Sequence, residues 1–281
     1  MNLRHFLDID LIDSDTIKHL INLGHKLKKT KKNKKFLHKK ILGMIFEKPS
    51  TRTRMSFDIA VKQLGGSSII LNPDVIHYGK GNESLKDTAK VLTEYADIVM
   101  LRTSAHKNLE EFGKYLEIPI INGLSDLSHP CQILSDIFTF EELKGNISNK
   151  NISWLGDANN NMSNSLIEAA GKFKFNLNIG CPEKYKPKSS IMKLAKKNNI
   201  KIQVTQNPKE AVENADCVMT DKWVSMNDKV NKKLKKKNLK KFQVNKKLMD
   251  LAKNDAIFMH CLPVGRGEEV TDEVIDGKKS V

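Results

Sequence analysis

The chain has 281 residues, and 48 lysine and arginine residues against 33 aspartate and glutamate residues give it a formal net charge of +15. This length is enough for two domains at roughly 100–200 residues each, and the absence of any run of about 18 apolar residues excludes a membrane-spanning helix. The first residues lack the apolar core of a secretion signal and the four cysteines lack paired spacing, so we expect free thiols in a reducing cytoplasm.

Short apolar runs alternate with helical patterns from residue 41 onward. In the first half, strands are predicted at 41–46, 68–71, 97–101 and 118–121, and helices at 53–64, 85–95, 109–116 and about 132–143. After a polar hinge at 145–150, strands are predicted at 152–155, 175–179, 202–204, 217–219 and 256–259, and helices at 163–173, 190–197 and 208–214. This alternation predicts two doubly wound α/β domains with parallel sheets, over residues 1–145 and 146–281.

The positive charge is carried almost entirely by lysine, because only five arginines occur. The lysine-dense stretches, 26–40 and 232–241, contain a single aromatic residue, Phe36, and no nucleic-acid motif. Such runs are usually solvated helix faces, so we expect no nucleic-acid partner. Arginine offers a planar fork for anions, and Arg52 and Arg54 fall within one short motif.

That motif follows the first predicted strand and opens the next helix. Its residues are Ser50, Thr51, Arg52, Thr53 and Arg54. A helix N-terminus favours anions through its unpaired N–H groups and its dipole, and hydroxyl and guanidinium donors strengthen that preference. An ordinary helix cap needs a single hydroxyl, and the glycine-rich pattern of a P-loop is absent. We predict a phosphate-like anion site here.

One further arginine and two further clusters lie near the ends of predicted strands. Arg102 comes after the third strand, His129-Pro130-Cys131-Gln132 precedes a helix, and His260-Cys261-Leu262-Pro263 follows the last strand. Ligands of open α/β sheets bind beyond the carboxyl ends of strands, so we expect a site between the two domains. The His and Cys spacings are not those of a structural zinc site, so no metal is expected.

Together these motifs resemble those of the transcarbamylases, and specifically of the ornithine carbamoyltransferases. The turn Gly156-Asp157-Ala158-Asn159-Asn160-Asn161-Met162 and the loop Asp221-Lys222-Trp223-Val224-Ser225-Met226 resemble two more of that family's motifs. The resemblance implies transfer of the carbamoyl group of carbamoyl phosphate to L-ornithine, which gives L-citrulline and phosphate. It also implies a homotrimer with active sites at subunit interfaces and no metal or organic cofactor.

The resemblance implies the site residues as well. Carbamoyl phosphate would be bound by Ser50, Thr51, Arg52, Thr53, His77, Arg102, His129, Pro130, Cys131, Gln132, Cys261 and Leu262. Ornithine would be bound by Asn161, Asp221, Ser225 and Met226, although the Asn159–Asn161 run leaves the choice of asparagine open. The catalytic groups would be Arg102 and His129, which stabilise the carbamoyl oxygen, and Asp221 and Cys261, which favour the free amine.

Three departures from the family pattern stand out. His77 replaces a usual glutamine, Asn227 replaces a usual glycine, and the final helix that returns to the first domain has no counterpart before Val281. The alternatives are a transcarbamylase for another amine, a catalytically impaired homologue and a basic nucleic-acid-binding protein. An anabolic and a catabolic role both remain open.

Overall fold

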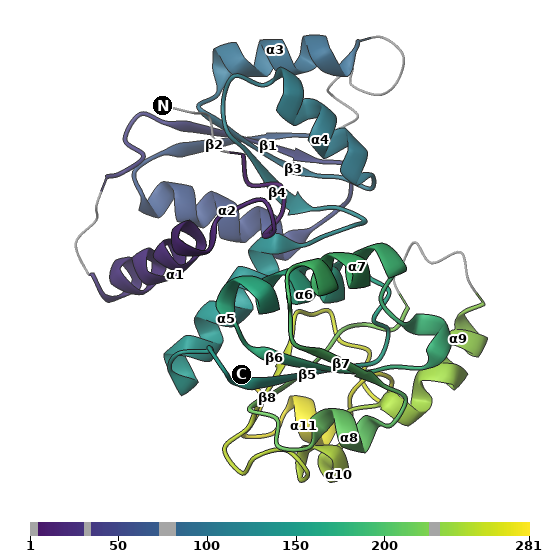
Figure 1. Ribbon diagram of the computed structural model, residues 1–281. Coiled ribbons are helices and arrows are strands. Elements are labelled where there is room, and N and C mark those ends of the chain that lie inside the picture. Colours follow the sequence, from purple (N-terminus) through teal and green to yellow (C-terminus); the bar gives the residue numbers. More distant parts are fainter. Residues whose placement is uncertain (1–4, 31–34, 73–82, 225–230) are drawn as a thin grey trace. The chain divides into compact units, whose positions relative to one another are not determined.

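The computed structural model describes residues 5–30, 35–72, 83–224 and 231–281. The chain divides into two compact units, Met1–Cys131 and Gln132–Val281, which we call unit 1 and unit 2 (Figure 1). Both are α/β units with parallel sheets, as predicted from the alternation of apolar runs and helical patterns. The predicted domain limits, 1–145 and 146–281, stay a prediction.

Unit 1 contains a four-stranded sheet in the order β2-β1-β3-β4. Its strands are β1 (Ile41–Phe46), β2 (Ser67–Leu71), β3 (Ile98–Arg102) and β4 (Ile120–Leu124), and its helices are α1 (Ser14–Lys29), α2 (Thr51–Gln63), α3 (Leu85–Tyr95) and α4 (His106–Tyr115). Helix α5 (Pro130–Lys144) begins in unit 1 and continues into unit 2.

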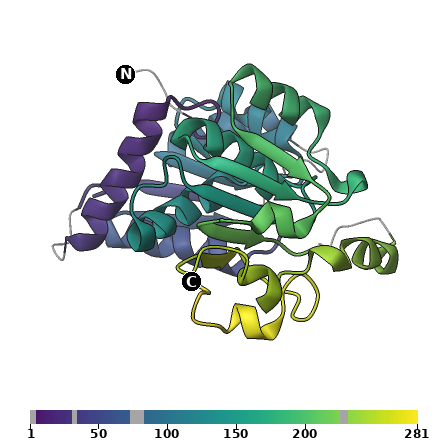
Figure 2. The same cartoon turned by 60° about the horizontal axis from the view of Figure 1, so that its bottom comes forward.

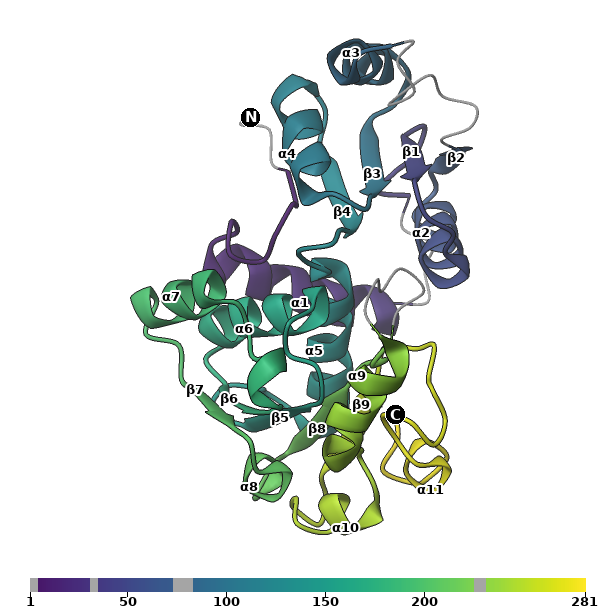
Figure 3. The ribbon, with the colours of Figure 1, turned by 90° about the vertical axis from the view of Figure 1, so that its right-hand side faces the viewer.

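Both faces of the first sheet are covered, which explains why its central strands are continuous apolar runs. Leu42, Met44 and Phe46 of β1 pack with Val61 of α2. Ile45 belongs to the opposite cluster, which packs against α3 and α4. Figure 3 shows α2 on one side of these strands and α4 on the other.

Unit 2 contains a five-stranded sheet in the order β7-β6-β5-β8-β9. Its strands are β5 (Asn151–Leu155), β6 (Asn176–Gly180), β7 (Ile202–Thr205), β8 (Cys217–Thr220) and β9 (Ile257–His260). Its helices are α6 (Asn161–Phe173), α7 (Ser189–Lys197), α8 (Pro208–Val212), α9 (Lys232–Leu239), α10 (Lys246–Met249) and α11 (Asp272–Ile275), with short 3-10 turns at Glu183–Tyr185 and Lys240–Phe242.

Helices α6 and α7 lie on one face of the second sheet, and α8, α10 and α11 lie on the other (Figure 1). The last residues of the chain, yellow in Figure 2, run beside β9, where the Phe258 N–H donates to the Lys279 carbonyl at 2.7 Å.

The predicted element types are correct, whereas several limits differ. Helix α2 begins at Thr51 instead of residue 53, and β4 covers Ile120–Leu124 instead of 118–121. Helices α1, α10 and α11 were not predicted from the sequence. Within the described parts of the chain, no helix has the length and apolarity needed to cross a membrane.

The end of β6 is packed too closely for a side chain. A Cβ atom on Gly180 would lie 2.6 Å from Leu155 Cδ2 and 2.8 Å from Ala211 Cβ. Gly180→Ala should therefore lower the free energy of unfolding by about 1–3 kcal/mol. Urea unfolding followed by tryptophan fluorescence measures this change, because both tryptophans, Trp154 and Trp223, lie in unit 2.

The control is Ser190→Ala on the exposed surface of α7, which should change the free energy of unfolding by less than about 0.5 kcal/mol. A Gly180→Ala variant as stable as this control would contradict the packing described for β6.

Candidate active site

The predicted anion motif forms the start of α2 in unit 1. Ser50 has an extended backbone and its Oγ accepts a hydrogen bond from the Thr53 N–H at 3.3 Å. Ser50 and Thr53 are half-buried, whereas Arg52 is exposed. The first turn of α2 carries no acidic residue. The positive end of the helix dipole is therefore not neutralised by a carboxylate of its own helix.

Arg102 reaches the same place from the end of β3. Its position in the sheet follows from the register, which pairs Arg102 with Phe46 at the end of β1. The Arg102 Nη1 donates to Thr53 Oγ1 at 3.2 Å, and the buried Nε has no hydrogen-bond partner among the described residues. Burial, and then the nearby charge of Arg52, lower the pKa of Arg102. The Arg102 guanidinium thus lies at the N-terminus of a helix whose first turn also contains Arg52.

Glu47, the acid that directly follows β1, is engaged elsewhere. Its carboxylate accepts hydrogen bonds from the Thr103 hydroxyl at 2.7 Å and from the Ser104 N–H at 3.0 Å. Glu47 therefore shapes the loop that follows Arg102.

His129 and Cys131 lie at the start of α5, on either side of Pro130. Burial, and then the charge of Arg102, lower the pKa of the half-buried His129 to about 3. A neutral imidazole carries one N–H and can donate a single hydrogen bond at pH 7. The Cys131 thiol points to the backbone instead, donating to the Asn122 carbonyl at 3.4 Å, and burial raises its pKa to about 12.

A second cluster of the predicted residues forms in unit 2, beyond the ends of β8 and β9. The Cys261 thiol donates to Asp221 Oδ1 at 3.2 Å, and the Lys222 N–H donates to the same oxygen at 2.6 Å. Burial raises the pKa of Asp221, and burial with the charge of Asp221 raises the pKa of Cys261. Cys261 is therefore a neutral hydrogen-bond donor, not a nucleophilic thiolate.

Leu262 follows directly, with a backbone φ of 56° that non-glycine residues seldom adopt. Its N–H donates to His260 Nδ1 at 2.9 Å, and His260 Nε2 lies 3.3 Å from Glu269 Oε1. His260 therefore has a structural role, because its Nδ1 holds the backbone of this turn and its Nε2 contacts the Glu269 carboxylate.

The asparagine run forms the turn between β5 and α6. Asn160 caps α6 by accepting from the Ser163 N–H at 2.9 Å, and its Nδ2 donates to the Asp157 carbonyl at 3.0 Å. These bonds occupy the Asn160 side chain. Asn159 is exposed, whereas Asn161 is half-buried as the first residue of α6. The geometry thus argues against Asn160 as a ligand-binding residue.

Comparison with known proteins identifies the family of this chain. Residues 4–142 match the profile of the aspartate/ornithine carbamoyltransferase, carbamoyl-P binding domain, and residues 148–281 match that of the Asp/Orn binding domain. The chain belongs to the aspartate/ornithine carbamoyltransferase family.

Close relatives are named ornithine carbamoyltransferase. The protein from Mesorhizobium japonicum is 45% identical over 100% of this chain and 93% of its own length, and that from Methanocaldococcus jannaschii is 46% identical over 99% and 92%. Among solved structures, ornithine carbamoyltransferase from Pyrococcus furiosus is 40% identical with a TM-score of 0.93, over 99% of this chain and 90% of that chain.

Three residues that the family resemblance predicts for the site, His77, Ser225 and Met226, lie outside the described residues. A metal site is not evident either, because the described residues contain no group of three or more potential metal-binding side chains.

The lysine-rich helix α9 forms a buried ion pair that was not predicted from the sequence. Lys235 Nζ lies 2.7 Å from Asp157 Oδ2, with side chains only 10% and 8% exposed. The prediction of a solvated lysine face is therefore wrong for Lys235. The ion pair joins α9 to the asparagine turn, and Leu239, four residues on, marks the buried face of the same helix.

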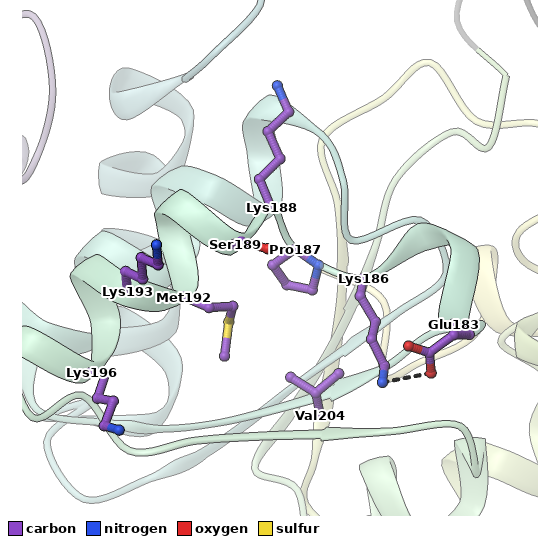
Figure 4. A pocket seen from close by; sticks show the side chains of 9 residues that line it. All are labelled: Glu183, Lys186, Pro187, Lys188, Ser189, Met192, Lys193, Lys196 and Val204. Atoms are coloured by element: carbon purple, nitrogen blue, oxygen red, sulfur yellow. Dashed lines mark ion pairs between the residues drawn. The ribbon is translucent and has the colours of Figure 1, made fainter.

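A separate hollow of about 680 Å³ lies over α7 and β7 (Figure 4). Its apolar lining comes from Pro187, Met192 and Val204, and four lysines surround it, of which Lys186 pairs with Glu183 at 2.6 Å. None of the predicted site residues lines it. Lysines around a surface hollow are expected in so lysine-rich a chain, so we assign it no role.

The ion pair of Lys235 with Asp157 makes a testable contribution to stability. Lys235→Met leaves a buried carboxylate without its cation, which should cost about 3–5 kcal/mol of unfolding free energy in urea. Asp157→Asn combined with Lys235→Met should recover part of that loss.

Lys233→Met, at an exposed position of the same helix, is the matched control and should change the unfolding free energy by less than about 0.5 kcal/mol. Equal unfolding free energies of the two single variants would show that the buried ion pair does not contribute to stability.

Proposed function

We propose that this chain is an ornithine carbamoyltransferase, which transfers the carbamoyl group of carbamoyl phosphate to the δ-amine of L-ornithine. The observation that carries the proposal is the hydrogen bond from Arg102 to Thr53 at the N-terminus of α2, whose first turn contains Arg52 and no acid. Carbamoyl phosphate supplies the anion for this place, since its leaving group is a phosphate.

In unit 1, Ser50, Thr51, Arg52 and Thr53 bind the phosphate and stabilise it as it leaves. Attack by the amine places negative charge on the carbamoyl oxygen, and Arg102 and the neutral His129 donate hydrogen bonds to that oxygen. The orphaned Nε of Arg102 supports this assignment, because a buried donor without a partner favours a ligand that supplies an acceptor.

In unit 2, Gln132 and the main-chain carbonyls around Cys261 and Leu262 accept hydrogen bonds from the carbamoyl NH2 group. Asp221 binds an amino group of ornithine, together with Asn161, Ser225 and Met226. Asp221 also helps to keep the δ-amine neutral, because its raised pKa gives the carboxylate more affinity for a proton than an exposed aspartate has. Proximity and charge stabilisation then carry the reaction, without a covalent intermediate.

We further propose that residues 1–145 bind carbamoyl phosphate and residues 146–281 bind ornithine, in a cytoplasmic homotrimer that serves arginine biosynthesis. A relative from Campylobacter jejuni, 38% identical with a TM-score of 0.91, is named an anabolic ornithine carbamoyltransferase. Light scattering should give the mass of three chains of 31.8 kDa.

The substrate is tested by assaying carbamoyl transfer with ornithine, putrescine and aspartate in parallel. We expect saturable citrulline formation with ornithine and little product with the other two amines. Product with another amine but none with ornithine would contradict the proposal, and so would the absence of product with every amine.

Arg102→Ala should lower kcat/KM for citrulline formation by at least about 100-fold, because it removes a hydrogen-bond donor to the developing oxyanion. Arg266→Ala is the matched control. Arg266 is an exposed arginine that pairs with Asp272 and Asp276, and its loss should leave the rate unchanged. A decrease of only a few-fold in kcat/KM for Arg102→Ala would show that Arg102 is not a catalytic group.

A further inference from the structure

A half-buried acid that the proposed reaction does not use lies one helical turn after Gln132. The Gln132 Nε2 donates a hydrogen bond to Asp136 Oδ1 at 2.9 Å, and both residues belong to α5. The second oxygen, Asp136 Oδ2, is buried and has no hydrogen-bond partner among the described residues. A buried carboxylate oxygen without a donor is costly, so its retention here needs a reason.

The chemistry of the pair supplies a reason. A primary amide presents a donor at one end and an acceptor at the other, and the two ends are nearly equal in shape. An ionised carboxylate can only accept, so Asp136 can hold Gln132 only by its NH2 group. The Gln132 Oε1 is then the end that turns away from Asp136.

We propose that Asp136 is a positioning residue, which fixes the Gln132 carboxamide with its oxygen toward the carbamoyl NH2 and so makes the enzyme prefer a carbamoyl group to an acetyl group. The inference rests on the proposed function, because it takes Gln132 as the residue that binds the carbamoyl amide. Acetyl phosphate has a methyl group where carbamoyl phosphate has its NH2. Only carbamoyl phosphate can therefore donate a hydrogen bond to an acceptor at this position.

The groups around Asp136 make its hydrogen bond with Gln132 sensitive to pH. Burial, and then the charge of Asp221 beyond β8, raise the pKa of Asp136 to about 7, against smaller opposing effects of Gln132 and of His260 at the end of β9. The neighbouring thiols, Cys217 and Cys261, have strongly raised pKa values and stay neutral. Below pH 7 Asp136 therefore gains a proton, can donate to Gln132 Oε1, and no longer fixes the amide.

The test compares dissociation constants for carbamoyl phosphate and acetyl phosphate, measured by calorimetry between pH 6 and 8.5. The wild type should prefer carbamoyl phosphate, and that preference should weaken as the pH falls through about 7. Asp136→Asn keeps the shape but offers both a donor and an acceptor. It should lower the preference about tenfold at pH 8 and make it independent of pH.

A double-variant comparison separates positioning from a general structural effect. Gln132→Leu should lose the same preference, and adding Asp136→Asn to it should lower the preference no further. Glu142→Gln, an exposed charge change on the same helix, should behave as the wild type.

Thermal melting checks the fold of Asp136→Asn. A carboxyl group whose pKa is higher in the folded than in the unfolded protein destabilises the fold above that pKa. The variant should therefore melt at or above the wild-type temperature at pH 8.

An Asp136→Asn variant with the wild-type preference and pH dependence would overturn the inference, as would a wild type with no preference for carbamoyl phosphate. Failure of the wild type to form citrulline from ornithine would overturn the proposed function instead. The two outcomes are distinguishable, because the binding preference is measured without ornithine.

Discussion

The positive end of helix α2 is the feature on which the rest of unit 1 depends. Ser50 holds the first turn, and the register of β1 with β3 brings Arg102 to Thr53. Guanidinium groups, a helix dipole and no acid in the first turn together form a local excess of positive charge. Such an excess is costly without an anion, so this part of the fold is prepared for a phosphate group.

Unit 2 has the opposite electrostatic character around its predicted residues. Asp136 and Asp221 are both half-buried residues whose carboxyl groups have raised pKa values, and each accepts a hydrogen bond, from Gln132 and Cys261 respectively. The positively charged start of α2 in unit 1 favours a phosphate, whereas the carboxyl groups in unit 2 favour an amine. The charge distribution thus follows the chemistry of the two substrates that we propose.

Much of this arrangement could be predicted from the sequence, because it depends on local order along the chain. Alternating apolar runs and helical patterns predicted the parallel sheets, and strand ends predicted the places of Arg102 and Cys261. The ion pair of Lys235 with Asp157 could not be predicted, because it depends on how α9 packs against a turn far away in the sequence. Asp136 was not predicted, because a single acid on an apolar helix carries no distinctive spacing.

The most direct test of the account is a titration of the ¹⁵N-labelled protein with inorganic phosphate, followed by the amide resonances. The amides of Arg52, Thr53 and Arg54 at the start of α2 should shift together and saturate. The amides of Ser190 and Ile191, at the start of α7 beside the lysine-lined hollow, should stay unchanged. Shifts at α7 without shifts at α2 would contradict the claim that the start of α2 is the phosphate site.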